Sequence, residues 1–215
     1  MLGNNMFAYC NNSPANFCDP GGNYGIINSN AMARNSGGKS FYSLPKDKYS
    51  KTTGMINGQA EFEHAHESFG WGTYAMNGCG AIAVYNAMQL LGKPQALGKI
   101  EDTLWLKHGM LGCGLLGVMP WSIDNYFAEQ NLLCNGYSTY NEFSKNVYEG
   151  AIVIVLIQND ANNVFKGMHY VTAQYTNQEY VIYNIYSDDP NTWTQESLYQ
   201  TSSYSCYLYG YIIGG

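Results

Sequence analysis

The chain of 215 residues is 46% hydrophobic, so it is long enough to bury one sizeable core and does not require two separate domains. Only 12% of the residues are charged, against about 25% in an average globular protein, and tyrosine and asparagine supply much of the remaining polar surface. The net charge of -6 and the scattered basic residues leave no cationic patch, which argues against nucleic-acid partners, and no apolar run is long enough to span a membrane.

The first 58 residues differ in composition from the rest of the chain. They are rich in asparagine, glycine and serine and carry few apolar positions, which is typical of extended or loop-like structure. We therefore expect residues 1–58 to form a loop-rich segment packed on a single domain of residues 59–215. The start of the sequence lacks the basic stretch and apolar run of a signal peptide. A secreted protein whose signal peptide has been removed would lack them too.

Cys79 is predicted to lie in the first turn of an amphipathic helix. Four later apolar residues recur at helical spacing and would share one buried face: Ala83, Ala87, Leu90 and Leu91. Asn77 is the expected N-cap, and Gly92 with Pro94 ends the pattern. At a helix N-terminus, unpaired N–H groups and the positive end of the helix dipole favour a thiolate, so Cys79 is a candidate nucleophile. The alternative is a buried structural cysteine.

The remaining elements divide the domain into a helical first half and a sheet-forming second half. Apolar spacing and the proline predict helices over Leu97–His108, from Pro120 onward and over Asn141–Tyr148. Runs of β-branched and aromatic residues predict strands over Ala151–Ile157, His169–Tyr175, Tyr180–Tyr186 and Tyr207–Ile213. This order predicts an α+β fold in which a helical lobe faces an antiparallel sheet lobe.

The predicted hairpin brings two polar residues together. If Tyr175 pairs with Tyr180, His169 and Asn184 become diagonal neighbours on one face of the sheet. A side-chain amide at that position can orient an imidazole. The hypothesis is that His169 takes the proton of Cys79 while Asn184 accepts a hydrogen bond from the other ring nitrogen. The alternative is that both are ordinary residues of the strands.

Three stretches together resemble a known family. They are NGCGAIAVYNAM around Cys79, GMHYVTAQY around His169 and YVIYN ending at Asn184. They resemble the papain-like cysteine peptidases, and are most similar to the bacteriocin-processing peptidases for double-glycine leaders and their free-standing bacterial relatives. The resemblance covers roughly residues 70–215.

The resemblance implies a papain-like fold, with Cys79 on the helical lobe and His169 on the sheet lobe. It implies Cys79 as the nucleophile, His169 as general base and acid, and Asn184 as the residue that orients the histidine. The expected activity is hydrolysis of a peptide bond through a thioester acyl-enzyme. The expected partner is a peptide or protein substrate, and no cofactor is expected.

The sequence departs from the family pattern just before the nucleophile. Papain-like peptidases usually carry a glutamine there that completes the oxyanion hole, and residues 71–78 contain none. Thr73, Asn77 and Trp71 are the candidate donors beside the Cys79 N–H, while Gln59 would require the chain to fold back. This gap keeps two alternatives open. One is a thiol-dependent acyltransferase or amidase on the same fold, and the other is a catalytically inactive peptide-binding relative.

The cysteine pattern bears on metal binding and on compartment. The six cysteines contain no C-x-x-C pair, which argues against a zinc ribbon or a thioredoxin-type motif. If Cys79 is free, an odd number remains, so a reducing compartment such as the cytoplasm is the simpler expectation. The sequence does not set the oligomeric state.

The segment Glu61–Glu67 is the one candidate metal site in the sequence. It places His64 and His66 two residues apart among carboxylates, so both rings could face one way on a strand. A structural zinc site needs about four ligands, and no second cluster supplies the others. We expect a solvated segment and no metal.

Overall fold

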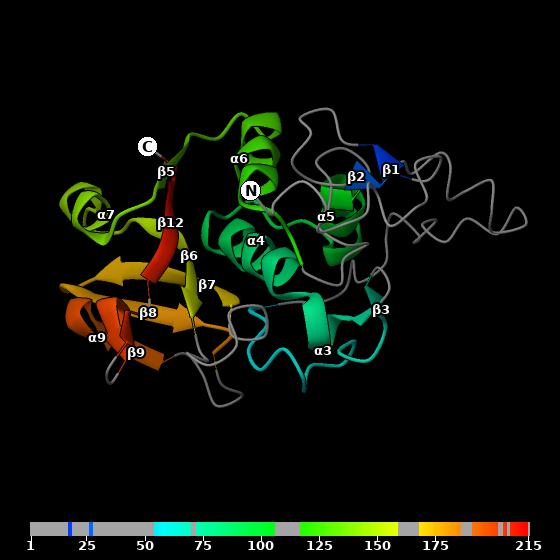
Figure 1. Ribbon diagram of the computed structural model, residues 1–215, viewed down its shortest axis with the longest axis horizontal. Helices are drawn as coiled ribbons and strands as arrows, with labels where there is room; N and C mark the ends of the chain where they lie inside the picture. Colours follow the sequence, from blue (N-terminus) through cyan, green and yellow to red (C-terminus); the bar gives the residue numbers. More distant parts are fainter. Residues whose placement is uncertain are drawn as a thin grey trace, which may run out of the picture.

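A six-stranded antiparallel sheet with helices on both sides organises the molecule (Figure 1). The computed structural model describes residues 54–69, 72–105, 117–158, 168–185, 191–201, 204–205 and 207–214, and two short strands at 17–18 and 26–27. The strand order is β5-β12-β6-β7-β8-β9, and every neighbouring pair is antiparallel. The predicted α+β class is confirmed.

The helices are α3 (Tyr74–Asn77), α4 (Cys79–Leu90), α5 (Leu97–Thr103), α6 (Pro120–Glu129), α7 (Tyr140–Asn146) and α9 (Gln195–Tyr199). The strands of the sheet are β5 (Cys134–Tyr137), β6 (Ile152–Gln158), β7 (Met168–Thr176), β8 (Glu179–Tyr183), β9 (Asn191–Thr194) and β12 (Tyr207–Ile213). Three further short pairs lie in the described part of the chain: β1 (Phe17–Cys18) with β2 (Ile26–Ile27), β3 (Ser68–Phe69) with β4 (Gly72–Thr73), and β10 (Gln200–Thr201) with β11 (Tyr204–Ser205).

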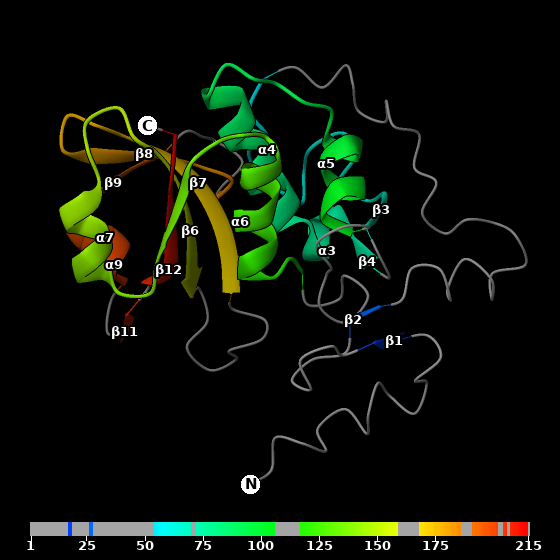
Figure 2. The ribbon, with the colours of Figure 1, turned by 90° about the horizontal axis from the view of Figure 1, so that it is seen from above.

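The two faces of the sheet carry separate cores. Figure 2 shows α4 and α6 on one side of the sheet and α7 and α9 on the other. The first core joins α4, α5 and α6 to the sheet, and the second is rich in tyrosine around Phe143 of α7. Two tyrosine hydroxyls there donate to main-chain carbonyls, Tyr207 to Tyr137 and Tyr140 to Gln195, each at 2.8 Å, whereas the Tyr180 hydroxyl is buried with no hydrogen-bond partner among the described residues. Within the described residues, no helix is long and apolar enough to cross a membrane.

Helix α4 is buried almost all round. Residues 80–88 are all buried, because α4 packs against β6 and β7 on one side and α5 on the other. The hydroxyl of Thr172 in β7 donates to the carbonyl of Ala83 in α4 at 2.7 Å, which joins helix and sheet directly. Of the predicted apolar face, Ala83 and Ala87 are fully buried, while Leu90 at the end of α4 and its C-cap Leu91 are partly buried.

The start of α4 differs from the prediction. Asn77 is not the N-cap but the last residue of α3, and Gly78 alone separates the two helices. The Gly78 N–H bonds the Tyr74 carbonyl, and a Cβ at Gly78 would come within 2.7 Å of the Tyr74 ring. A glycine thus lets α3 run almost directly into α4.

The hairpin has the predicted register, but its second strand is shorter than expected. Tyr175 pairs with Tyr180, which confirms the predicted pairing. The two loop residues, Asn177 and Gln178, have φ of 53° and 65°, as a type I′ turn requires. β8 ends at Tyr183, which pairs with Thr172, so β7 continues past the end of its partner.

For the other elements, the observed bounds differ from the predicted ones mainly at the ends. The strand Tyr207–Ile213 and the helix start at Pro120 are confirmed, and the helix expected at 141–148 spans Tyr140–Asn146. Helix α5 ends at Thr103, and residues 106–116 lie outside the described part. The edge strands β5 and β9 and helix α9 were not predicted, because they are short and mostly polar at the sequence level.

Residues 54–59 form a strap across α4. Ile56 is 3% exposed, and the buried Asn86 side chain binds both its N–H and its carbonyl, each at 2.9 Å. The Tyr85 hydroxyl donates to the Gly54 carbonyl at 3.1 Å. These contacts attach the strap to the core. The division into residues 1–58 and 59–215 stays a prediction.

We expect Asn86→Ala to lower the free energy of unfolding by about 2 to 4 kcal/mol, because it leaves a buried N–H and a buried carbonyl of Ile56 without partners. Urea denaturation measures this change. Thr103→Ala is the matched control: it removes an exposed side-chain bond to the Lys99 carbonyl and should change stability by less than about 0.5 kcal/mol. Equal effects of the two substitutions would contradict the assignment of the strap to the core.

Candidate active site

Cys79 is the first residue of α4 and is half-buried against β7. Burial raises the pKa of its thiol. The hydrogen bond and the charge of His169 outweigh this effect, together with hydrogen bonds from the main chain of Tyr170 and Gly80, and the net pKa lies below the ordinary value. The surroundings of the sulfur therefore favour the thiolate.

The pKa of His169, near the start of β7, is shifted in the opposite direction to that of Cys79. Burial lowers the pKa of its imidazole, but the hydrogen bond and the negative charge of Cys79 raise it, as does a hydrogen bond to the main chain of Asn184. The net pKa lies above the ordinary value. The two shifts together favour a thiolate–imidazolium pair.

The main-chain donor from Tyr170 exists because of the hairpin. In this register the N–H of Tyr170 lies on the side of β7 that faces β8, as do those of Thr172 and Gln174. β8 ends opposite Thr172, so no strand among the described residues pairs with the Tyr170 N–H. That donor is left for the Cys79 sulfur at the edge of the sheet.

Asn184 lies beside His169, as the register predicted, but it uses a different atom. The acceptor for the His169 Nε2 is the main-chain oxygen of Asn184, at 2.5 Å, and not its side chain. Because a carbonyl can only accept, Nε2 carries the proton and Nδ1 is left for the sulfur. Asn184 has φ of 69°, so the chain turns out of the strand there and directs its carbonyl to the ring.

The side chain of Asn184 points elsewhere. Its Nδ2 donates to Oε1 of Gln59 at 3.5 Å. Its Oδ1 is buried and has no hydrogen-bond partner among the described residues. The expectation that the amide orients the imidazole is therefore corrected, since the main chain makes the contact.

None of the three candidate oxyanion donors makes a described contact with the Cys79 sulfur. Trp71 lies outside the described residues, and the Thr73 side chain makes no capping hydrogen bond at the start of α3. The Asn77 amide nitrogen is buried without a hydrogen-bond partner in the described part of the chain. The chain does fold back at Gln59, whose Nε2 donates to the carbonyl of Ala75 at 3.0 Å. The role of these residues stays a prediction.

The sequence did not indicate two contributors to this site. One is the main chain of Tyr170, and the other is Asn57, whose Oδ1 accepts from the Asn184 N–H at 3.1 Å. A main-chain donor has no residue signature, and Asn57 and Asn184 lie 127 residues apart. No local pattern connects such positions.

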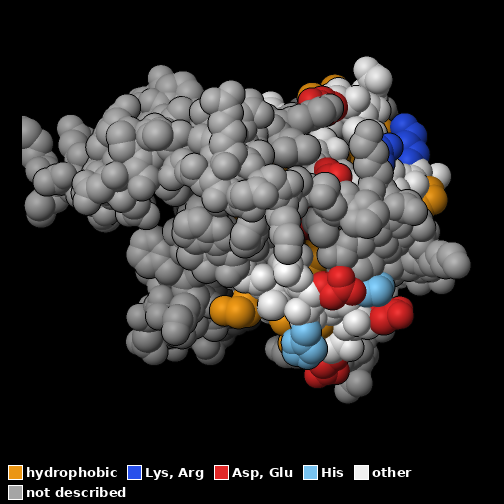
Figure 3. All heavy atoms as spheres, turned by 90° about the vertical axis from the view of Figure 1, so that its right-hand side faces the viewer, with side chains coloured by type: hydrophobic (Ala, Val, Ile, Leu, Met, Phe, Trp, Pro, Cys, Tyr) orange, Lys and Arg blue, Asp and Glu red, His pale blue; other side chains and the backbone are white. Residues whose placement is uncertain are grey.

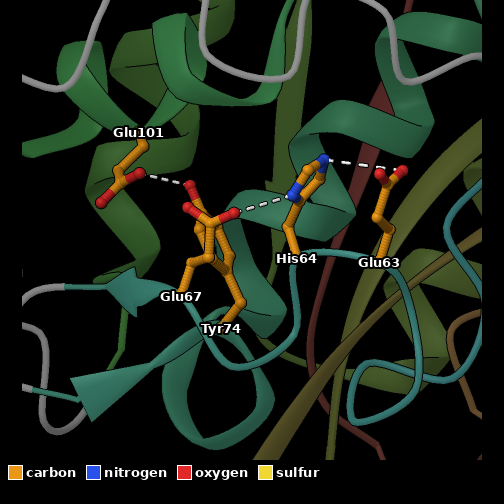
Figure 4. Close-up of polar contacts among 5 residues, drawn as sticks. All are labelled: Glu63, His64, Glu67, Tyr74 and Glu101. Atoms are coloured by element: carbon orange, nitrogen blue, oxygen red, sulfur yellow. Dashed lines mark hydrogen bonds and ion pairs between the residues drawn. The ribbon is translucent and has the colours of Figure 1, made fainter.

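In the segment Glu61–Glu67, the His64 ring contacts two carboxylates. Figure 3 shows histidine and acidic side chains together on one face of the molecule, and Figure 4 shows His64 between Glu63 and Glu67. The His64 Nδ1 lies 2.9 Å from Glu67 Oε1, and Nε2 lies 3.8 Å from Glu63 Oε2. Near them, Tyr74 donates a hydrogen bond to the buried Glu101. The described residues contain no group of three or more His, Cys, Asp or Glu placed to hold a metal ion.

A second free thiol, Cys134 on β5, provides an internal contrast to Cys79. Burial raises the pKa of Cys134, and so do the charge of Asp124 and its hydrogen bond with the sulfur at 3.5 Å. The environments of the two thiols thus shift their pKa values in opposite directions. The side chains of the other four cysteines lie outside the described part of the chain.

No protein-family model and no curated protein matches the sequence. Among solved structures, the chain is similar to the peptidase domain of Streptococcus ComA, a bi-functional ABC transporter involved in a quorum sensing pathway. The sequence identity is 10% and the TM-score is 0.46, over 65% of this chain and 92% of that chain. At this identity and TM-score, the likeness does not by itself assign an activity or a role to any residue.

We expect iodoacetamide to alkylate Cys79 near neutral pH and to leave Cys134 unmodified in the folded protein. An ordinary thiol is only a few per cent thiolate at about pH 7, whereas the surroundings of Cys79 favour the thiolate. In His169→Gln, the pKa of Cys79 should rise and its alkylation at neutral pH should slow roughly tenfold. Peptide mapping by mass spectrometry measures both sites, and equal rates at Cys79 and Cys134 would contradict the prediction.

Proposed function

We propose that the protein is a cysteine peptidase in which Cys79 is the nucleophile and His169 is the general base and acid. The observation that carries the proposal is the hydrogen-bonded Cys79–His169 pair, whose pKa shifts favour a thiolate beside an imidazolium. The pair joins a helix N-terminus to a strand of the opposite lobe, as the sequence resemblance implies.

Acylation would begin with attack of the Cys79 thiolate on the carbonyl carbon of the scissile peptide bond. A carbon–sulfur bond forms, and the carbonyl oxygen becomes an oxyanion. As the carbon–nitrogen bond breaks, the His169 imidazolium gives its Nδ1 proton to the leaving amine. The product is a thioester on Cys79 and a neutral imidazole, with the new peptide N-terminus released.

Deacylation would use the same two side chains. The neutral His169 removes a proton from water, and the resulting hydroxide attacks the thioester carbon. The carbon–sulfur bond then breaks, which restores the thiolate and the imidazolium and releases the carboxyl product. Through both halves, the Asn184 carbonyl holds the Nε2–H and keeps the ring in one orientation.

The oxyanion would be held by N–H donors near the start of α4. The main chain of Cys79 is the first candidate, because it opens the helix. Asn77 is the side-chain candidate, because its buried amide nitrogen has no partner among the described residues and it lies two positions before the nucleophile. Thr73 and Trp71 stay as the other candidates.

Cys79→Ala should lower peptide hydrolysis by at least about 1,000-fold, because it removes the nucleophile. A peptide library read by mass spectrometry measures cleavage, with Cys134→Ala as the control that should keep wild-type rates. Acid quenching during turnover should trap an acyl group on Cys79, and its mass identifies the acyl donor. Transfer of the acyl group to an amine would identify an acyltransferase instead of a peptidase. An acyl donor that is not a peptide would identify an acyltransferase or amidase. Unchanged cleavage by Cys79→Ala would refute the proposed mechanism.

The rate constant kcat/KM should follow a bell-shaped dependence on pH. It should rise as the Cys79 thiol loses its proton, at a pH below the ordinary cysteine pKa, because the nucleophile is the thiolate. It should fall as His169 loses its proton, at a pH above the ordinary histidine pKa, because the leaving amine then has no proton donor. An acidic limb at the ordinary pKa of a thiol would contradict the ion-pair interpretation.

A further inference from the structure

Asn184 is held in an unusual conformation at the point where it supports His169. Its φ of 69° lies in the left-handed region, which costs energy for a residue other than glycine, although asparagine tolerates it better than most. Asn184 is 1% exposed and follows directly after the end of β8, so ladder hydrogen bonds of the sheet do not hold it. Tertiary contacts must therefore maintain this conformation.

The strap supplies those contacts. The Asn57 Oδ1 accepts from the Asn184 N–H at 3.1 Å, while the Asn184 carbonyl takes the His169 Nε2–H at 2.5 Å. One end of the residue is thus tied to the strap and the other to the imidazole. A rotation of Asn184 about its φ or ψ angle would turn the carbonyl away from the ring.

Gln59, also in the strap, links Asn184 to helix α3, which precedes Cys79. Its Oε1 accepts from Asn184 Nδ2 at 3.5 Å, and its Nε2 donates to the carbonyl of Ala75 in α3 at 3.0 Å. Helix α3 leads through Gly78 to Cys79. The strap therefore contacts both the residue that supports His169 and the element that leads to Cys79.

We propose that Asn57 is a positioning residue for the Cys79–His169 pair, because its side-chain oxygen holds Asn184 in the conformation whose carbonyl orients the imidazole. Asn57 does not touch the reacting atoms and acts through Asn184. The proposal rests on the thiol chemistry proposed for Cys79. It makes the strap, which precedes the nucleophile by about twenty residues, part of the active centre.

The test compares Asn57→Ala, Asn57→Asp and Tyr85→Phe in the full chain. The readout is the rate of iodoacetamide alkylation of Cys79 as a function of pH, with kcat and KM for a cleaved peptide. We expect Asn57→Ala to slow alkylation at neutral pH and kcat by 10- to 100-fold, the usual cost of losing a residue that orients a functional side chain, with a smaller change in KM. Asn57→Asp keeps an oxygen acceptor and should restore kcat, with both limbs of the pH profile moved to higher pH because the added negative charge raises the pKa of both groups.

Tyr85→Phe is the matched control, because it removes the strap contact at Gly54 without touching Asn184. It should keep the wild-type pH profile even if the protein becomes less stable. Near-ultraviolet circular dichroism and a urea midpoint establish that each variant is folded. Should Asn57→Ala not fold, Asn57→Gln tests the same contact, since it keeps the polar group and displaces the oxygen by one methylene.

A wild-type profile for folded Asn57→Ala, no rescue by Asn57→Asp, or an equal loss in Tyr85→Phe would overturn the role of Asn57. An ordinary thiol pKa for Cys79 in the wild-type protein is a different result. It would overturn the proposed function, and the role of Asn57 with it. The alkylation profile of the wild type is therefore measured first.

Discussion

The end of β8 opposite Thr172 is the constraint on which the rest of the site depends. Beyond this point, among the described strands, only β6 still pairs with β7, and the first residue of α4, Cys79, lies at the other edge of β7. The Tyr170 N–H, which would otherwise bond a strand, bonds the Cys79 sulfur instead. The preceding residue, His169, faces the same sulfur. Because β8 is short, Cys79 at the N-terminus of α4 can lie beside His169 at the edge of the sheet.

The electrostatics of that pair follow from its position between the lobes. Burial alone would keep the thiol and the imidazole neutral, because both charged forms lose hydration. Each group instead favours the charge of its partner, and main-chain donors and acceptors complete the contacts. The separation between the lobes must then stay constant, since the balance depends on short contacts. The bond from Thr172 to Ala83 fixes β7 against α4 a short distance away.

Backbone conformation at Asn184 connects the fold to the chemistry in another way. A left-handed asparagine at the end of a strand is strained, and its N–H, carbonyl and side-chain amide contact three different residues. Two of these residues, Asn57 and Gln59, belong to the strap, which Asn86 attaches to the core through Ile56. The buried Asn86 and Asn184 and the half-buried Asn57 and Gln59 thus form a network from α4 to the imidazole, in which amides rather than charges make the contacts.

The sequence by itself determined the α+β class, the helix that starts near Cys79, the strand at 207–213 and the pairing of Tyr175 with Tyr180. These follow from side-chain periodicity and turn chemistry, which are local properties. The sequence also selected Cys79, His169 and Asn184, partly through resemblance to a family. Only the tertiary structure decided which atom of Asn184 meets the histidine, that the Tyr170 N–H meets the sulfur, and that Asn57 and Gln59 reach Asn184. Main-chain donors carry no residue signature, and contacts across more than a hundred residues depend on how the lobes pack, which periodicity does not encode.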